Sequence, residues 1–286
     1  MTMMDYESYI HNLPVMPQVA ARIMKINEEN LTISFKDLEK IIMVDPFLSS
    51  KILKVANSAL YARQKQITNL QTAITLLGFK TIKSLVLLVS ASTMFRKYSR
   101  IPFHQTFWKH SLLTAFIAKD AAEQYGMKSI RDEIFLAGLL HDLGRVALFH
   151  SEPEAYSRLL EEQEAEGKAT RELEQKYFNT DHKEVGGAIL AHWNFPEILS
   201  SPAREHGMLH ITSPHKNAVL LVTVADIIAL EVTQGTVTEE KEDLLAAIVN
   251  LTPLTAEQIT FYRDEFIRQI ELEPFFGECV SLFNVA

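Results

Sequence analysis

The chain has 286 residues, of which 47% are hydrophobic and 22% charged, as is ordinary for a water-soluble globular protein with a sizeable core. Its single cysteine, Cys279, excludes an internal disulfide and a cysteine-based metal site. The net charge of −8 is uneven, because residues 1–100 hold 13 Lys and Arg against 7 Asp and Glu. These basic residues are dispersed and form no run, so the sequence gives little support for nucleic-acid binding.

The sequence also bears on localisation. The N-terminal segment MTMMDYESYIHNL has no basic stretch followed by an apolar core, so we expect no signal peptide. The longest uninterrupted apolar runs, such as Leu85–Val89, are far too short to cross a bilayer. We therefore expect a cytoplasmic protein that does not contact a membrane.

Helical periodicity runs through the first hundred residues, without convincing strand alternation. A one-sided apolar stripe predicts a helix across 13–27. Asp45 suits the N-cap of a later helix, and Pro46 suits its first position, where no amide donor is needed. Gly78 should end the next helix. The segment after it, 81–95, is apolar on nearly every face and should be buried.

Charge and a proline interrupt the hydrophobic pattern in RKYSRIPFHQ, residues 96–105, where we expect the boundary between two lobes, 1–100 and 101–286. Beyond it the periodicity predicts helices at about 106–124, 131–149, 152–166, 170–178, 182–192, 214–231, 239–250 and 255–270. The expected fold class is therefore all-α, with two helical lobes.

Polar side chains stand out at three places on helices that are otherwise apolar: His110, the pair His141-Asp142, and Asp226. Burying such groups without a partner costs several kcal/mol, so we expect helix packing to bring them together. A mixed set of imidazole and carboxylate ligands suits Fe, Mn, Co, Ni or Zn. A structural His–Asp hydrogen-bond network remains the alternative, since one His-Asp dipeptide is a weak signal.

The order His110, His141-Asp142, Asp226 resembles that of the HD superfamily of metal-dependent phosphohydrolases. More closely, DPFLSSKILKVANSALY, AGLLHDLGRVAL and HKEVGGAILAHWNFP are similar to segments of the HDOD family, the output-domain relatives of HD proteins in bacterial signalling. The resemblance covers about residues 10–235. It implies a two-lobed helical HDOD fold whose C-terminal lobe is an HD-type helical core.

The resemblance also implies a ligand set. Two further histidines, His182 and His206, correspond to additional ligands of the HD-type phosphodiesterases that hydrolyse cyclic-di-GMP. The expected metal ligands are His110, His141, Asp142, His182, His206 and Asp226. They would hold one or two divalent transition-metal ions, iron or manganese in the first place and zinc or nickel as alternatives, with Asp142 as the bridging carboxylate.

The chain departs from those phosphodiesterases in three places. Thr106, one turn before His110, stands where the metal-rich enzymes can place a carboxylate. Glu205 stands where they have a second histidine, and GMLHITSPHKN replaces their GYP motif. We expect His210 and His215 of that segment to cap and close the site. We therefore expect a signalling module that acts through other signalling proteins and carries a structural or regulatory metal site. The alternative is an active metal-dependent phosphohydrolase acting on a nucleotide or other phosphate ester. Its candidate catalytic residues are Asp142, Arg145 and Lys183. The side chain of Arg145 or Lys183 could hold a phosphate-containing ligand.

Overall fold

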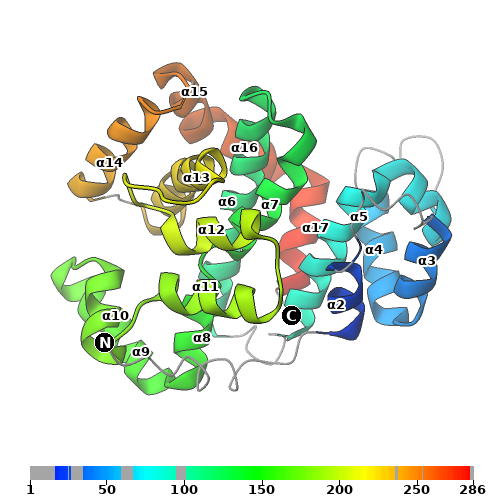
Figure 1. Cartoon of the computed structure of the whole chain (residues 1–286), viewed down its shortest axis with the longest axis horizontal. Helices are drawn as coiled ribbons and strands as arrows, with labels where there is room; N and C mark the ends of the chain where they lie inside the picture. The colour runs from blue at the N-terminus through cyan, green and yellow to red at the C-terminus, as the bar shows by residue number, and fades with distance from the viewer. Residues whose placement is uncertain are drawn as a thin grey trace. The chain divides into compact units, whose positions relative to one another are not determined.

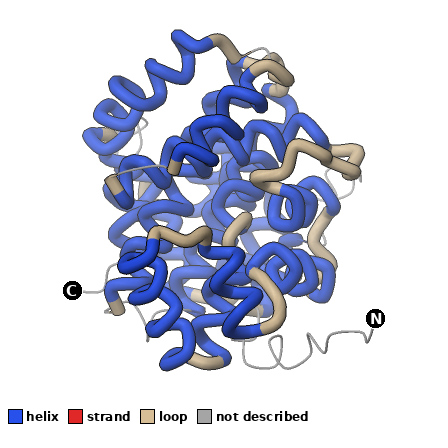
Figure 2. The backbone as a smooth tube through the Cα atoms, turned by 90° about the vertical axis from the view of Figure 1, so that its left-hand side faces the viewer, coloured by secondary structure: helices blue, strands red, loops and turns tan. Residues whose placement is uncertain are grey.

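The computed structural model of the protein describes residues 17–24, 26, 35–58, 67–94, 101–235, 238–252 and 254–283. All regular secondary structure in these ranges is helical, and Figure 2 shows no strand among them, so the expected all-α class is confirmed for this part of the chain. The α-helices labelled in Figure 1 are α2 (Gln18–Met24), α3 (Phe35–Met43), α4 (Pro46–Ser58), α5 (Leu70–Met94), α6 (Pro102–Gln124), α7 (Arg131–Leu140), α8 (Leu143–Ser151), α9 (Pro153–Glu166), α10 (Thr170–Phe178), α11 (His182–His192), α12 (Glu197–Glu205), α13 (Lys216–Gln234), α14 (Glu239–Val249), α15 (Ala256–Phe261), α16 (Ile267–Leu272) and α17 (Pro274–Phe283). A 3-10 segment, η3 (Lys128–Ile130), and a π segment, η4 (Tyr262–Phe266), complete the list.

The chain divides into two compact units. Among the described residues, unit 1 comprises 113–255, and unit 2 comprises 17–112 together with 256–283. This division differs from the expected lobes, 1–100 and 101–286, because the first half of α6 and the helices α15 to α17 group with the N-terminal helices. The reason is packing, since α17 contacts α4 and α5. Residues 96–100 of the expected boundary lie outside the described residues.

The helix starts and stops expected in unit 2 are present. α4 begins at Pro46, and Oδ1 of Asp45 accepts hydrogen bonds from the amides of Phe47 at 3.0 Å and Leu48 at 3.1 Å, which confirms the N-cap. Gly78 has φ +80° and ψ 164°, so α5 is two helices joined at this glycine. The second of them is buried almost continuously, from Ile82 to Ser92.

The C-terminal helix completes the core of unit 2. The ring of Phe283 stacks on Trp108 with centroids 4.1 Å apart and planes 17° apart, and both side chains are buried. At the rim, Nζ of Lys54 lies 2.8 Å from a carboxylate oxygen of Glu278. Two stretches far apart in the sequence therefore share one hydrophobic core.

In unit 1, the helix expected over 131–149 is in fact two helices. α7 ends at Leu140 and α8 begins at Leu143, so the pair His141-Asp142 occupies the break between them. Gly144 then lets α8 lie directly on α11, because a Cβ there would fall 1.9 Å from the carbonyl oxygen of His182. This close approach brings the break beside the first residue of α11.

One helix of unit 1 has no counterpart among those expected from the sequence. α12 contains Pro202, and a proline inside a segment argues against a helix when only the local sequence is considered. It forms nonetheless, since Leu199 and Ala203 are buried and the helix packs against α7, α11 and α13. Tertiary packing outweighs the local preference here.

Two helices, α5 and α13, are long and apolar enough to cross a membrane by length and composition alone. Of their most apolar windows, 50% and 67% respectively are already buried within the structure. Core helices of water-soluble proteins meet the same criterion, so this is weak evidence for a membrane segment.

Candidate metal centre

Five of the six expected ligands lie in unit 1, at ends or breaks of helices or within a buried helix. His141 and Asp142 occupy the break between α7 and α8, His182 is the first residue of α11, and His206 follows the last residue of α12. Asp226 lies in the middle of α13. All five are buried, with exposures from 0% to 8%. The fold thus gathers polar groups from distant parts of the sequence into one buried site.

Each of the three histidines is oriented through its Nδ1 atom. Nδ1 of His141 lies 2.7 Å from the carbonyl oxygen three residues earlier, and Nδ1 of His206 lies 2.8 Å from the carbonyl oxygen four residues earlier. Nδ1 of His182 lies 2.5 Å from Oε2 of Glu174. These oxygens only accept hydrogen bonds, so we assign the hydrogen to Nδ1. Nε2 of a neutral ring then carries the lone pair that a metal ion needs.

The Nε2 atoms face carboxylate oxygens. Oδ1 of Asp142 lies 3.5 Å from Nε2 of both His182 and His206. Nε2 of His141 lies 3.7 Å from Oδ2 of Asp142 and 3.5 Å from Oδ1 of Asp226. Two ligand atoms bound to one ion at the tetrahedral angle are about 3.4 Å apart, given metal–ligand bonds of about 2.1 Å. The spacing therefore fits ligands that share an ion.

The protonation of His206 and Asp142 points the same way, whereas burial would lower the pKa of His141 but Asp142 and Asp226 raise it. Burial lowers the pKa of His206 to about 4, so this ring is neutral at pH 7. Burial would raise the pKa of Asp142, but the basic groups around it, among them the permanently charged Arg145, hold it well below its usual range, so the carboxylate is ionised. A lone pair that faces a carboxylate is repelled unless a cation lies between them. The donor chemistry fits a divalent metal ion.

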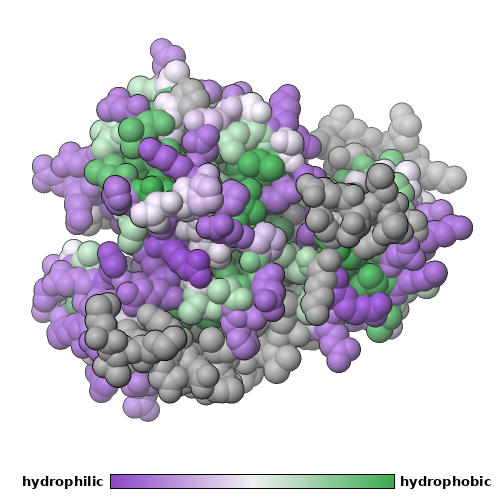
Figure 3. All heavy atoms as spheres, in the orientation of Figure 1, coloured by the Kyte–Doolittle hydropathy of each residue, from purple (hydrophilic) through white to green (hydrophobic). Residues whose placement is uncertain are grey.

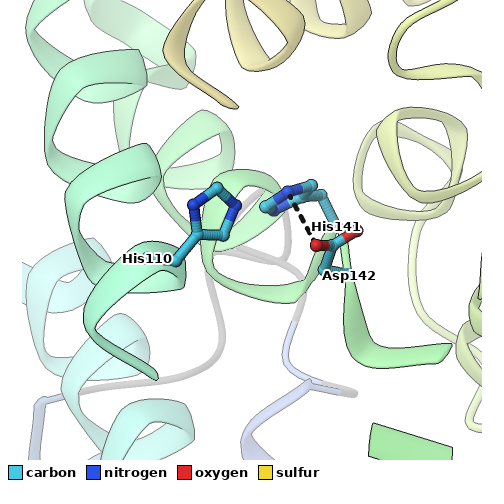
Figure 4. Close-up of side chains that lie close together, drawn as sticks. All are labelled: His110, His141 and Asp142. Carbon is cyan, nitrogen blue, oxygen red and sulfur yellow. Dashed lines mark ion pairs between the residues drawn. The ribbon is translucent and has the colours of Figure 1, made fainter. Parts of the chain in front are cut away.

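Ligand atoms of unit 1 that lie within 4.8 Å of one another form two overlapping groups: His141, His206 and Asp226; Asp142, His182 and His206. Figure 4 draws the pair His141-Asp142 at the break between α7 and α8. The sixth expected ligand, His110, is a buried residue of α6 and belongs to unit 2. The two groups of unit 1 share His206, whose Nε2 atom binds one ion, so together they would hold at most two ions.

The two cations expected to hold a phosphate are bound to the protein itself. Nη1 of Arg145 donates to Oδ2 of Asp142 at 3.2 Å, and its Nε donates to the hydroxyl of Tyr156 at 3.3 Å. Burial would lower the pKa of Arg145, but Tyr156 and Asp142 raise it, so the guanidinium stays charged. Nζ of Lys183 donates to the carbonyl oxygen of His206 at 2.5 Å. Both side chains therefore brace the site.

Two residues of the site, Glu174 and Tyr156, were not expected from the sequence. Glu174 has no solvent exposure and accepts hydrogen bonds from the amide of His182 at 2.9 Å and from the hydroxyl of Tyr156 at 3.2 Å, besides the His182 ring. A signal was present, because Glu174 follows the buried Leu173 and lies four residues before the buried Phe178. A carboxylate on the apolar face of a helix needs a buried partner.

Glu205 organises the loop after α12. Its carboxylate accepts hydrogen bonds from the amides of Thr212 at 3.1 Å and Ser213 at 3.2 Å, and from the hydroxyl of Thr212. Glu205 belongs to none of the ligand groups formed by the described residues. Of the two histidines expected to close the site, His210 is exposed and His215 is partly buried.

Replacing Glu174 with glutamine should lower the affinity for Mn²⁺ by about 10–100-fold, as is usual when a carboxylate that orients a metal-binding histidine is lost. Calorimetric titration of metal-free protein measures the effect. The matched control is Glu172→Gln, an exposed position on the same helix, which should keep the wild-type affinity. Equal affinities for both variants and the wild type would show that Glu174 does not orient His182.

A model of the HDOD domain family matches residues 13–208 of the chain. Over 214 residues the chain is 25% identical to an uncharacterised protein of Treponema pallidum, a match that covers 74% of this chain and 41% of that protein. The chain therefore spans about two fifths of the length of this curated relative.

Two solved structures resemble the whole chain. A candidate signal transduction protein from Marinobacter aquaeolei aligns with a TM-score of 0.77 at 17% identity, over 100% of this chain and 62% of that one. A candidate phosphohydrolase from Shewanella amazonensis aligns with a TM-score of 0.75 at 19% identity, over 99% of both chains. At these identities the likeness shows the fold alone.

Proposed function

Because the chain belongs to the HDOD domain family, we propose that it is a cytoplasmic bacterial signalling module with a structural or regulatory metal site, acting through other signalling proteins. The name of the Marinobacter structure supports a role in signal transduction. The ions are one or two divalent transition metals, iron or manganese before zinc or nickel. His110, His141, Asp142, His182, His206 and Asp226 would hold them.

One observation carries this proposal over an enzyme: the cations beside the site are already satisfied by the protein. Hydrolysis of a phosphate ester needs an open coordination position and a free group to hold the phosphate. Arg145 is bonded to Asp142 and Tyr156, and Lys183 to a backbone carbonyl. A metal ion bound here would act as a Lewis acid, but the surrounding residues favour its use as a brace among α7, α8, α11, α12 and α13.

Exposed apolar side chains support action through protein partners. Met43 and Val44 are 60% and 68% exposed, and Phe47 follows them at the start of α4 with 38% exposure. Figure 3 shows hydrophobic patches between the hydrophilic side chains on the face in view. Contiguous exposed apolar surface is typical of sites where another protein binds, so this turn is where we expect a partner to bind.

An active phosphohydrolase remains the second candidate, because the two oxygens of Asp142 face different histidines. Oδ1 faces His182 and His206, and Oδ2 faces His141. A carboxylate so placed is suited to bridge two ions, which is how two-metal sites activate water. The fold shared with the Shewanella protein agrees with this candidate.

The test loads the protein with Mn²⁺ or Fe²⁺ and assays nucleoside phosphates, cyclic dinucleotides and an aryl phosphate. We expect no turnover above that of His141→Ala and Asp142→Ala, since the signalling role needs occupancy and not chemistry. Turnover by the wild type that is lost in both variants would overturn the module in favour of the phosphohydrolase.

A further inference from the structure

The helices α9 and α10 form a hairpin that is tied together on its outer side. Nζ of Lys176 donates to both carboxylate oxygens of Glu162, at 2.6 and 2.7 Å, and the hydroxyl of Tyr177 donates to the same carboxylate at 2.9 Å. The amide of the Gln163 side chain donates to the hydroxyl of Thr170 at 2.7 Å. Gly167, at φ +66°, makes the turn between the helices. The hairpin can therefore respond as one body.

On its inner side the hairpin is joined to the candidate metal ligands by a closed circuit of polar contacts. Glu174 of α10 accepts from Nδ1 of His182 and from the hydroxyl of Tyr156 on α9. The hydroxyl of Tyr156 accepts from Nε of Arg145, whose Nη1 donates to Asp142. Asp142 in turn faces Nε2 of His182 at 3.5 Å. Two members of the circuit, His182 and Asp142, are thus candidate metal ligands.

We propose that the α9–α10 hairpin reports the occupancy of the metal site, and that Glu174 and Tyr156 are the positioning residues that transmit it. The inference rests on the metal site of the proposed function and adds the element that responds to it. Metal binding should change the orientation of the His182 ring, and through it the contacts of Glu174. With an ion on Nε2, the ring of His182 is held with Nδ1–H toward Glu174. Without the ion, the lone pair of Nε2 faces the Asp142 carboxylate, which disfavours that orientation.

The consequence for the hairpin follows from burial. Glu174 and Tyr156 have 0% exposure. A fully buried carboxylate is costly when it loses a hydrogen-bond donor, so a ring that turns away from Glu174 weakens the inner side of the hairpin. The outer side is indifferent to this change, because the Glu162 contacts involve no residue of the circuit. Metal loading should therefore reduce local opening of α9 and α10.

Hydrogen exchange of the full-length protein, with and without saturating Mn²⁺, tests the inference. In the wild type we expect loading to slow amide exchange in α9 and α10 by about tenfold, with no change in α4 of unit 2. Tyr156→Phe, measured at saturating Mn²⁺, should lose this difference in α9, because Tyr156 joins α9 to Arg145 and Glu174. Tyr177→Phe is the matched control, since it also removes a tyrosine–glutamate hydrogen bond of the hairpin, and it should keep the difference.

The outcomes separate the inference from the proposed function. If calorimetry detects no Mn²⁺ binding by the wild type, the metal site fails, and the hairpin inference falls with it. If Mn²⁺ binds but exchange in α9 and α10 is unchanged, the inference alone is overturned. A difference that persists in α9 of Tyr156→Phe also overturns it, because α9 then responds by a route other than the circuit. Should Tyr156→Phe fail to fold, Glu174→Gln at saturating Mn²⁺ makes the same comparison.

Discussion

Replacing Asp142 with alanine should remove the bound metal and lower the stability of the protein together. Asp142 contributes oxygens 3.5 Å from two Nε2 atoms, those of His182 and His206, and it accepts the 3.2 Å hydrogen bond from Arg145. Without it, a divalent ion loses its central carboxylate, and the affinity should fall by more than about 100-fold. The buried guanidinium also loses its carboxylate partner, a loss that costs about 3–5 kcal/mol in comparable buried pairs.

Elemental analysis and denaturant unfolding of purified protein measure the two effects. Asp243→Ala, at an exposed position of α14 in the same unit, is the matched control and should behave as the wild type. Two results would contradict the prediction. A wild type with far less than one metal per chain favours the structural His–Asp network. Wild-type metal content in Asp142→Ala excludes this carboxylate as a ligand.

Replacing Gly144 with alanine should destabilise unit 1 by about 3 kcal/mol or more, an unusually large effect for one methyl group. The added Cβ would lie 1.9 Å from the carbonyl oxygen of His182 and 2.7 Å from the amide nitrogen of Gly186. Both are backbone atoms of α11, so relief requires the two helices to separate. The separation would also move His182 away from Asp142, and metal affinity should fall with stability.

Gly277 offers the matched control, because it also lies within a helix and a Cβ there would meet no heavy atom within 4 Å. Gly277→Ala should raise the free energy of unfolding by about 0.5–1 kcal/mol, the ordinary preference of helices for alanine. Denaturant unfolding of both variants provides the comparison. Equal stabilities would mean that α8 and α11 have room that the backbone distances do not show.

Helix positions could be predicted where the sequence carries both an apolar stripe and end signals. α10 and α11 lie at the residues expected, 170–178 and 182–192. Asp181 explains the second start, since its carboxylate accepts from the amides of Lys183 and Glu184. α12 could not be predicted, because Pro202 opposes a helix locally and only contacts with other helices favour it.

The site could be predicted in part for a related reason. His141, Asp142 and Asp226 stand out because their own helices are apolar, and the structure brings them together. Glu174 belongs to a highly charged helix, so its position beside Leu173 and Phe178 is a weaker signal than a carboxylate on an apolar helix. Its role depends on how α10 lies beside the start of α11, which is a property of tertiary packing. The sequence also could not show that Arg145 is bound within the protein, because its hydrogen bond to Tyr156 depends on tertiary packing.

The composition of unit 2 from two stretches of sequence has a consequence for biosynthesis. Ribosomes deliver the chain from its N-terminus at roughly 5–20 residues per second, so residues 113–255 separate Trp108 from Phe283 by roughly 10–30 s. During that interval the nascent N-terminal helices lack the last-made helix that covers part of their core. Protection by chaperones matters most in this window, and a ribosome that stalls within unit 1 leaves a product whose first-made part is unfinished.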